Sequence, residues 1–394
     1  MKFRLCTLRS SLLPLTLVLP GASFLAGCGA PPLTTSAAEG LANVDADAEG
    51  GVFGQSQQAL EHGHRLLECQ PQVRFVGRVD TSDPDVARFG WSGTGVTARF
   101  LGTSVEVTLG GKQQYTVVID GEVQPTLVST GGTHELATGL SWGVHEVELY
   151  RRVEAHQGES EFYGFDFGSG VALPPPRAPE RRIEIIGDSN TCGYGNEGVG
   201  PECTYTPDTQ NHYLSYGAIA ARNVGAELST LCWSGKGIVC NYGDDETSCV
   251  DPLPALLERT LPERADSVWD HSRFQPHAVV INLGANDIST DVDPTQPELE
   301  AGYEQLLERT RERYPEALIL ATLGPIRPER QFLLSFFENA IARRAEAGDS
   351  QVMIIALPAT DPANGLGCDY HPSLLTHESL ATALTGALRT ELGW

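Results

Sequence analysis

The chain has 394 residues, of which 41% are hydrophobic, and this is enough for more than one buried core. Its formal net charge is −24, with 27 lysines and arginines against 51 aspartates and glutamates. Binding to nucleic acid or directly to an anionic membrane surface requires clustered cations, so the composition argues against both functions. A neutral polymer is compatible with this acidity, whereas a polyanionic one would be repelled.

The N-terminus has the features of a bacterial secretory signal. Three cations open the chain: Lys2, Arg4 and Arg9. They precede an apolar stretch at residues 12–25 that is too short to span a membrane stably. The following Leu25-Ala26-Gly27-Cys28 resembles a lipobox, which implies a lipoprotein signal over residues 1–28 and lipid acylation of Cys28. We therefore expect a secreted lipoprotein of the cell envelope, at the outer membrane or cell surface. Ordinary secretion with signal cleavage is the alternative.

Two regions of different composition follow. Residues 29–70 are rich in Ala, Gly, Ser and Gln without periodicity, which predicts a flexible tether. Residues 71–172 alternate between apolar and polar positions, for example at Val105, Val107 and Leu109, and this period predicts an all-β sandwich of jelly-roll type. Such a domain could bind glycan or serve only as structural support. The run Pro174-Pro175-Pro176 then forms a stiff spacer.

From residue 181 to the end, strand and helix patterns alternate. Strands are predicted at residues 183–186, 227–231, 278–283, 317–322 and 352–356, and helices at 213–223, 297–314, 329–347 and 374–392. This alternation predicts an α/β domain with a doubly wound parallel sheet and helices on both faces.

Four short motifs in this α/β region carry the chemistry. They are Gly187-Asp188-Ser189, Ser234-Gly235-Lys236-Gly237, Gly284-Ala285-Asn286-Asp287 and Asp369-Tyr370-His371-Pro372. Ser189 follows a β-branched run, so it lies at the carboxyl end of a strand, where open α/β sheets place their ligand sites. Each motif alone has an ordinary explanation as a turn or a helix cap. Their joint order, each beside a predicted strand or the last helix, favours a catalytic site.

The residue types in these motifs suit acyl transfer. A serine hydroxyl needs an imidazole to accept its proton, and His371 is the best candidate for this base, with Asp369 as the group that orients the ring. The amides of Ser189 and Gly235 and the side-chain NH2 of Asn286 are the candidate donors to the oxyanion.

Residues 187–198, 282–287 and 367–372 resemble the SGNH (GDSL) hydrolases and, more narrowly, carbohydrate esterase family 2. The resemblance covers residues 74–394, because that family also carries an N-terminal β-sandwich. It implies Ser189 as nucleophile, Gly235 and Asn286 as oxyanion donors, His371 as base, and removal of O-acetyl groups from polysaccharides such as xylan or glucomannan.

The chain departs from the wider superfamily at its last block. The usual block is Asp-x-x-His, whereas Cys368 occupies the position of the acid here. Family 2 includes both Ser-His-Asp triads and Ser-His dyads in which a main-chain carbonyl orients the ring. We expect a triad completed by Asp369, with the dyad as the alternative.

Cysteine usage indicates an oxidising compartment. Of nine cysteines, Cys6 is lost with the signal and Cys28 is acylated, which leaves seven: Cys69, Cys192, Cys203, Cys232, Cys240, Cys249 and Cys368. Pairs of Cys240 with Cys249 and of Cys192 with Cys203 would each close a local loop, although spacing alone does not determine connectivity. No Cys-x-x-Cys pair exists, and His62-Gly63-His64 lies in the expected tether, so we expect no metal and no cofactor.

Three functions remain open on the sequence. The first is a cell-surface esterase that removes O-acetyl groups from polysaccharides, and its partner would be an acetylated polysaccharide. The second is an esterase or lipase acting on lipid or small acyl esters, which the same chemistry permits but which would need an apolar groove. The third is a non-catalytic envelope adhesion lipoprotein, against which the presence of all four motifs argues.

Overall fold

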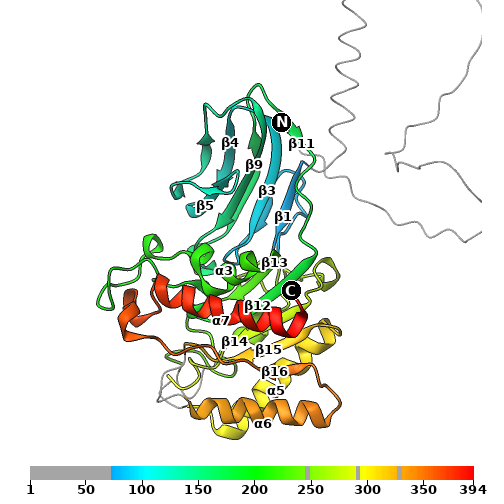
Figure 1. The fold of residues 1–394 in the computed structure, drawn as a ribbon, viewed down its shortest axis with the longest axis vertical. Helices are drawn as coiled ribbons and strands as arrows, with labels where there is room; N and C mark the ends of the chain where they lie inside the picture. Colours follow the sequence, from blue (N-terminus) through cyan, green and yellow to red (C-terminus); the bar gives the residue numbers. More distant parts are fainter. Residues whose placement is uncertain (1–71, 245–248, 290–292, 326–330) are drawn as a thin grey trace, which may run out of the picture. The chain divides into compact units, whose positions relative to one another are not determined.

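The computed structural model describes residues 72–244, 249–289, 293–325 and 331–394 (Figure 1). The signal sequence with Cys28, the tether, Cys69 and the His62-Gly63-His64 segment lie outside the described residues. Residues Gln72–Trp394 belong to one unit by their contacts, so the sandwich and the α/β region can be described together. Among the described helices, none combines the length and apolarity that crossing a bilayer requires.

The first half of this unit consists of two antiparallel sheets, as the alternating pattern predicts. One sheet contains β1 (Val73–Val76), β3 (Gly95–Gly102), β9 (Gly143–Arg151), β5 (Gln113–Ile119), β6 (Glu122–Val123), β7 (Leu127–Ser129) and β11 (Val171–Leu173). The other contains β2 (Ala87–Phe89), β10 (Ser160–Asp166), β4 (Val105–Gly110) and β8 (Gly132–Ala137). Val105, Val107 and Leu109 of β4 point into the shared core, which explains their period of two.

The second half is a five-stranded parallel sheet. Its strand order is β13 (Ala226–Cys232), β12 (Arg181–Gly187), β14 (Ala278–Asn282), β15 (Leu318–Thr322) and β16 (Val352–Ile354). The helices α3 (Tyr216–Asn223) and α7 (Leu374–Leu392) pack on one face, and α5 (Gln296–Arg313) and α6 (Phe332–Glu346) pack on the other. The predicted fold class, a sheet-rich N-terminal domain followed by an SGNH-type α/β domain, is confirmed.

Short elements occupy the loops between these strands and helices. They are α2 (Ser189–Cys192), α4 (Leu253–Leu256) and the 3₁₀ turns η1 (Ala155–Gln157), η2 (Pro207–Thr209), η3 (His212–Leu214), η4 (His271–Arg273), η6 (Pro362–Asn364) and η7 (Cys368–Tyr370). The helix predicted at residues 213–223 begins at Tyr216, because the η3 turn and the extended Ser215 precede it. The last strand ends at Ile354, two residues before the predicted end.

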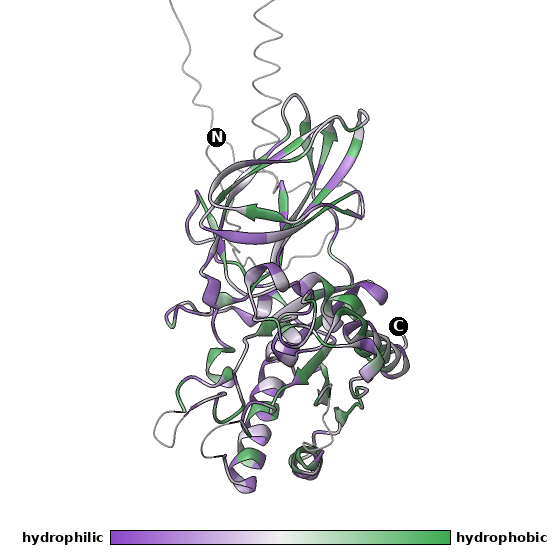
Figure 2. Cartoon of the chain, turned by 90° about the vertical axis from the view of Figure 1, so that its left-hand side faces the viewer, coloured by the Kyte–Doolittle hydropathy of each residue, from purple (hydrophilic) through white to green (hydrophobic). Residues whose placement is uncertain are grey.

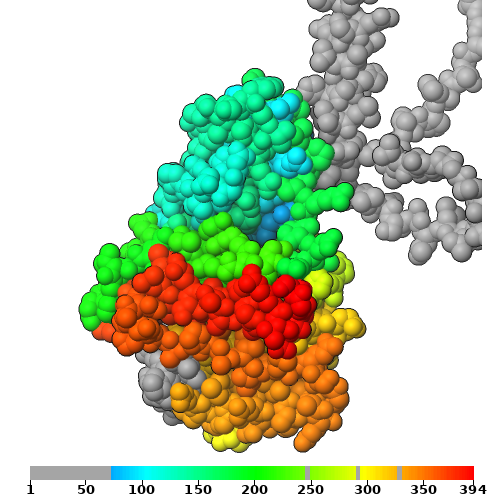
Figure 3. All heavy atoms as spheres, in the orientation of Figure 1, coloured from blue at the N-terminus to red at the C-terminus, as the bar shows by residue number. Residues whose placement is uncertain are grey.

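The parallel sheet is buried on both of its faces. All five residues of β14 are buried, as expected for a parallel sheet covered on both faces, and the strands between the helices in the lower half of Figure 2 are largely green, the colour of hydrophobic residues. α7 begins with the Ser373 hydroxyl accepting the Thr376 amide, and its outer surface is visible as a red band in Figure 3.

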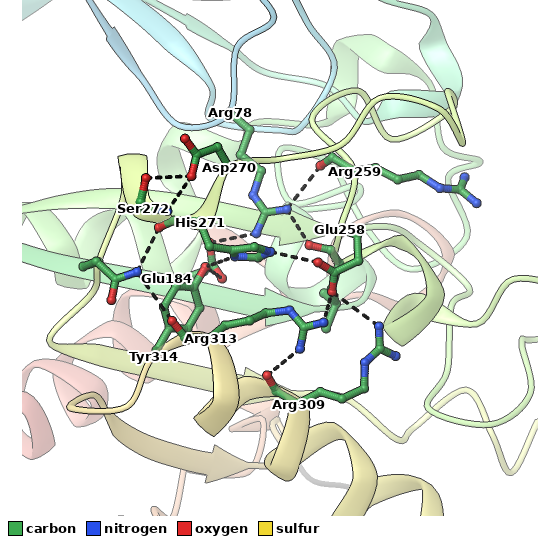
Figure 4. Close-up of polar contacts among 12 residues, drawn as sticks. Arg78, Glu184, Glu258, Arg259, Asp270, His271, Ser272, Arg309, Arg313 and Tyr314 are labelled. Atoms are coloured by element: carbon green, nitrogen blue, oxygen red, sulfur yellow. Dashed lines mark hydrogen bonds and ion pairs between the residues drawn. The ribbon is translucent and has the colours of Figure 1, made fainter. Parts of the chain in front are cut away.

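A buried ion pair joins the two domains. Arg78, from the sandwich, is 1% exposed, and its Nη2 lies 3.3 Å from Oε2 of Glu184 in the middle of β12 (Figure 4). Arg78 Nη1 also donates to the Leu257 carbonyl at 2.6 Å. The Tyr314 and Ser229 hydroxyls donate to the Glu184 carboxylate at 2.9 and 3.0 Å. Each charge thus loses its water but keeps several hydrogen bonds, which makes the pair costly to break from one side.

We expect Arg78→Ala to lower the free energy of unfolding by about 3–5 kcal/mol, because it leaves the Glu184 carboxylate buried without its cation. The measurement is denaturant unfolding of the purified protein. Arg264→Ala is the matched control, since Arg264 also reaches across the domains, to Glu159, but is 48% exposed, and its loss should cost about 1 kcal/mol or less. Equal effects of the two substitutions would contradict this account.

Candidate active site

Ser189 lies where β12 ends. It is the first residue of α2, its exposed fraction is 8%, and the preceding Asp188 caps this short helix by accepting the Asn190 amide. A side chain at Gly187 would put its Cβ 2.0 Å from Thr191 Oγ1 and 2.9 Å from the Asn282 carbonyl oxygen. Only glycine therefore allows the strand to turn into α2 this tightly.

His371 reaches Ser189 from the other end of the sequence. Its Nε2 lies 2.9 Å from Ser189 Oγ, a hydrogen bond between residues 182 positions apart. His371 follows η7 and precedes α7, on the loop that the sequence predicted beside the nucleophile. This contact is the one that proton transfer from the hydroxyl requires.

The ring of His371 is oriented by a main-chain carbonyl. Its Nδ1 lies 3.0 Å from the carbonyl oxygen of Asp369. Asp369 and Tyr370 both have positive φ, 51° and 62°, and with the His371 amide donating to the Cys368 carbonyl they form a tight turn just before His371. This differs from the expected triad, in which the Asp369 side chain would contact Nδ1, and it agrees with the dyad alternative.

The Asp369 carboxylate forms a hydrogen bond with a neighbouring tyrosine instead. Its Oδ2 accepts hydrogen bonds from the Tyr194 hydroxyl and the Tyr205 amide, both at 2.9 Å. The Tyr194 ring packs against the His371 ring with centroids 4.3 Å apart and stacks on the Tyr205 ring at 4.1 Å. Desolvation and the hydrogen bond to Asp369 raise the pKa of the Tyr194 hydroxyl, which therefore stays protonated. The Asp369 carbonyl thus contacts the ring of His371, while the Asp369 carboxylate binds Tyr194, which packs on that ring.

The three expected oxyanion donors leave from neighbouring strands. Gly187, Cys232 and Asn282 form one row across β12, β13 and β14. Ser189, Gly235 and Asn286 each come within four residues after the end of their strand, β12, β13 and β14. Asn286 Nδ2 donates to the Lys236 carbonyl at 2.9 Å, and Gly235, with φ 80°, accepts the Tyr242 amide at 2.7 Å. The sheet register therefore gathers these groups at one edge, as the motifs indicate.

Asp287, the last residue of the third motif, supports the loop after Gly235. It is fully buried and accepts the amides of Ile238, Val239 and Cys240 at 2.7–3.0 Å. Burial raises the pKa of its carboxyl to about 6, although the three amides oppose the shift. The sequence offered one signal for this role, a carboxylate directly after the candidate donor Asn286.

Among the residues that the structure describes, three disulfides join the loops of the site. Of the two local pairs that the spacing allows, Cys240–Cys249 is present, whereas Cys192 and Cys203 each have another partner. Cys192, at the end of α2, pairs with Cys232 at the end of β13, and Cys203 pairs with Cys368 beside His371. Spatial proximity decides these pairings rather than distance along the chain, because β12 and β13 are neighbours in the sheet and Cys368 begins η7. Within the described ranges, no group of three or more His, Cys, Asp or Glu side chains could hold a metal ion.

Family comparisons agree with this architecture. The carbohydrate esterase 2 N-terminal model matches residues 75–176, and the GDSL-like lipase/acylhydrolase model matches residues 185–378. A solved structure of a family two carbohydrate esterase from Clostridium thermocellum in complex with cellohexaose is 37% identical, with a TM-score of 0.77; the match covers 82% of this chain and 99% of that one. The chain belongs to carbohydrate esterase family 2. The resemblance carried by the motifs is therefore confirmed.

Two curated relatives show how this family 2 chain differs in extent. The cellulase/esterase CelE of Acetivibrio thermocellus is 39% identical over 337 residues, which are 83% of this chain but only 40% of CelE. An acetylxylan esterase/glucomannan deacetylase of Cellvibrio japonicus is 26% identical over 351 residues, covering 86% of this chain and 94% of that enzyme. Both domains of this chain thus have counterparts in these enzymes.

We expect Asp369→Asn to lower kcat less than about tenfold, because the main-chain carbonyl that contacts Nδ1 remains and asparagine tolerates the positive φ of this position. Initial rates on an acetyl ester measure the effect. Tyr194→Phe, which removes the other partner of the same hydrogen bond, should behave similarly. A loss approaching the roughly 10⁴-fold of the serine-protease reference case would instead assign the orienting role to the carboxylate.

Proposed function

We propose that this protein is a serine esterase that removes O-acetyl groups from polysaccharides such as acetylated xylan or glucomannan. The observation that carries the proposal is the 2.9 Å contact between His371 Nε2 and Ser189 Oγ, at the sheet edge from which the candidate oxyanion donors also extend. Membership of carbohydrate esterase family 2 and the activities in the names of its relatives support the substrate class.

Each residue of the site has a role in one step of the proposed reaction. His371 accepts the proton of Ser189 Oγ, which attacks the acetyl carbonyl carbon to form a tetrahedral intermediate. The main-chain amides of Ser189 and Gly235 and the Asn286 side chain donate to its oxygen. His371 then donates the proton to the departing sugar oxygen, and the C–O bond to the sugar breaks. Water, deprotonated by the same imidazole, hydrolyses the acetyl-enzyme and releases acetate.

The imidazolium formed in these steps is stabilised by the Asp369 carbonyl. A carbonyl oxygen accepts the Nδ1–H and holds the tautomer in which Nε2 faces the serine. This acceptor is neutral, so it stabilises the charged ring less than a carboxylate would.

We expect activity to fall steeply from acetate to octanoate esters of p-nitrophenol, because a small pocket walled by the loops of Gly235 and Asn286 would accept acetyl but clash with long chains. Acetate release from acetylated xylan and glucomannan should accompany it. Ser189→Ala and His371→Ala are the controls, and each should retain no more than a few per cent of the wild-type rate while remaining folded. A preference for octanoate, or no acetate release from any acetylated polysaccharide, would favour the lipid-esterase alternative.

We propose in addition that the enzyme works at the outside of the cell envelope, held by lipid on Cys28. The lipobox-like sequence supports the anchor, and the disulfides among the described cysteines support an oxidising compartment. The tether of residues 29–70 would separate the anchor from the catalytic unit by roughly 35 Å on average.

Accordingly, Cys28→Ala should release the protein from membrane fractions without changing its rate on soluble acetylated polysaccharide. Immunoblots of cell fractions and acetate assays measure the two effects. Ser36→Ala, in the tether, is a matched control that should stay in the membrane fraction. A Cys28→Ala protein that remained in the membrane fraction would argue against the anchor.

A further inference from the structure

One carboxylate of the sandwich domain is fully buried and has no part in the steps above. Glu154 follows β9 and precedes η1, and its exposed fraction is 0%. Its main chain is held firmly, because Arg151 Nη2 donates to the Glu154 carbonyl at 2.6 Å and the Gln157 amide donates to it at 3.1 Å. The side chain therefore extends from a fixed point.

The Glu154 side chain crosses into the α/β domain and binds the residue before Gly235. Its Oε2 accepts the Ser234 amide at 2.6 Å, and its Oε1 accepts the Ser234 hydroxyl at 2.5 Å. Both the main-chain amide and the side-chain hydroxyl of Ser234 thus donate hydrogen bonds to one carboxylate. The torsions of Ser234 set the direction of the next N–H, which is that of Gly235. Glu154 consequently controls a candidate oxyanion donor that it does not touch.

A glutamine links the same carboxylate to the helix of the nucleophile. Gln210 Nε2 lies 3.3 Å from Glu154 Oε1 and 3.2 Å from the carbonyl of Cys192, the last residue of α2. The Arg152 side chain in turn donates to the Gln210 carbonyl at 3.2 Å. Residues 151–154 of the sandwich domain therefore connect the Ser234-Gly235 loop with the helix that begins at Ser189.

Charge at this position is costly, which argues against a purely stabilising role. Burial raises the pKa of the Glu154 carboxyl to about 7 even though three hydrogen bonds oppose the shift, and the nearby Asp188 adds to it. His156, whose Nδ1 lies 3.9 Å away, has its own pKa lowered by burial and supplies little compensating charge. An apolar residue would fill the same space without this desolvation cost.

We propose that Glu154 is a positioning residue, contributed by the N-terminal domain, that holds Ser234 so that the Gly235 amide points at the developing oxyanion. This inference rests on the proposed esterase function, because it concerns the same site. The role is separate from that of Asp287, which holds the loop after Gly235 by three amides. The two buried carboxylates, one from each domain, fix the loop on both sides of the donor.

The test compares two changes of Glu154 on p-nitrophenyl acetate. Glu154→Ala should lower kcat by about ten- to a hundredfold with KM changed less than about twofold, because an oxyanion donor acts mainly in the transition state. Glu154→Gln keeps an oxygen that can accept the Ser234 amide, and it should restore kcat to within about fivefold of wild type.

Glu159→Ala is the matched control. Glu159 lies five residues further along and also reaches the α/β domain, through its ion pair with Arg264, but it does not touch the loop of Gly235. Its substitution should leave kcat unchanged. Wild type and Glu159→Ala must both hydrolyse the ester; if neither does, the proposed function fails, not the role of Glu154.

Three results would overturn the inference once wild-type activity is shown. They are a folded Glu154→Ala enzyme with kcat within twofold of wild type, a change confined to KM, and no rescue by Gln. If Glu154→Ala does not fold, Glu154→Asp replaces it, since the shorter carboxylate keeps the charge but draws back from the Ser234 amide. Asp should then be much less active than Gln, and an Asp variant as active as Gln would refute the positioning role.

Discussion

The parallel pairing of β12 with β13 and β14 is the constraint on which the site depends. Gly187, Cys232 and Asn282 end these strands in one row, so the chain leaves the sheet three times at nearly the same place. Ser189, Gly235 and Asn286 come from those three exits. A shift of one residue in either pairing would move a donor by about 3.3 Å along its strand, which exceeds the tolerance of an oxyanion hydrogen bond. The buried apolar faces of the strands fix this register.

The loops beyond that row have little regular structure, and disulfides and hydrogen bonds to buried carboxylates hold them instead. Cys192–Cys232 joins the helix of the nucleophile to the strand before the oxyanion loop, and Cys203–Cys368 holds the turn that presents the base. Asp287 and Glu154 bind main-chain amides on either side of Gly235. A site assembled in this way needs an oxidising environment to form, which agrees with the secretory signal expected at the N-terminus.

The sequence was sufficient for the parts of the fold and site that depend on local pattern. Period two identified β4 and β9, and a nearly continuous apolar run marks β14, because burial on one or two faces leaves a direct mark on composition. The pairing of Ser189 with His371 followed from motif order. The orienting group could not be read in this way, since a main-chain carbonyl is present at every residue and only the left-handed turn at Asp369 and Tyr370 selects it. Glu154 gave no signal either, because its partner Ser234 is 80 residues away in another domain.

For the same reason, the sequence does not show which contacts the sandwich domain makes with the α/β domain. Arg78 places a buried cation beside Glu184 in β12, three residues before Gly187, where the nucleophile motif begins. Glu154 binds the residue before an oxyanion donor. An α/β domain without the sandwich would retain Ser189, His371 and Asn286, yet it would leave the Glu184 carboxylate without its cation and the Ser234 amide without its acceptor. The catalytic unit of this esterase is therefore the pair of domains, and the sandwich contributes to the rate by holding groups that it does not itself supply.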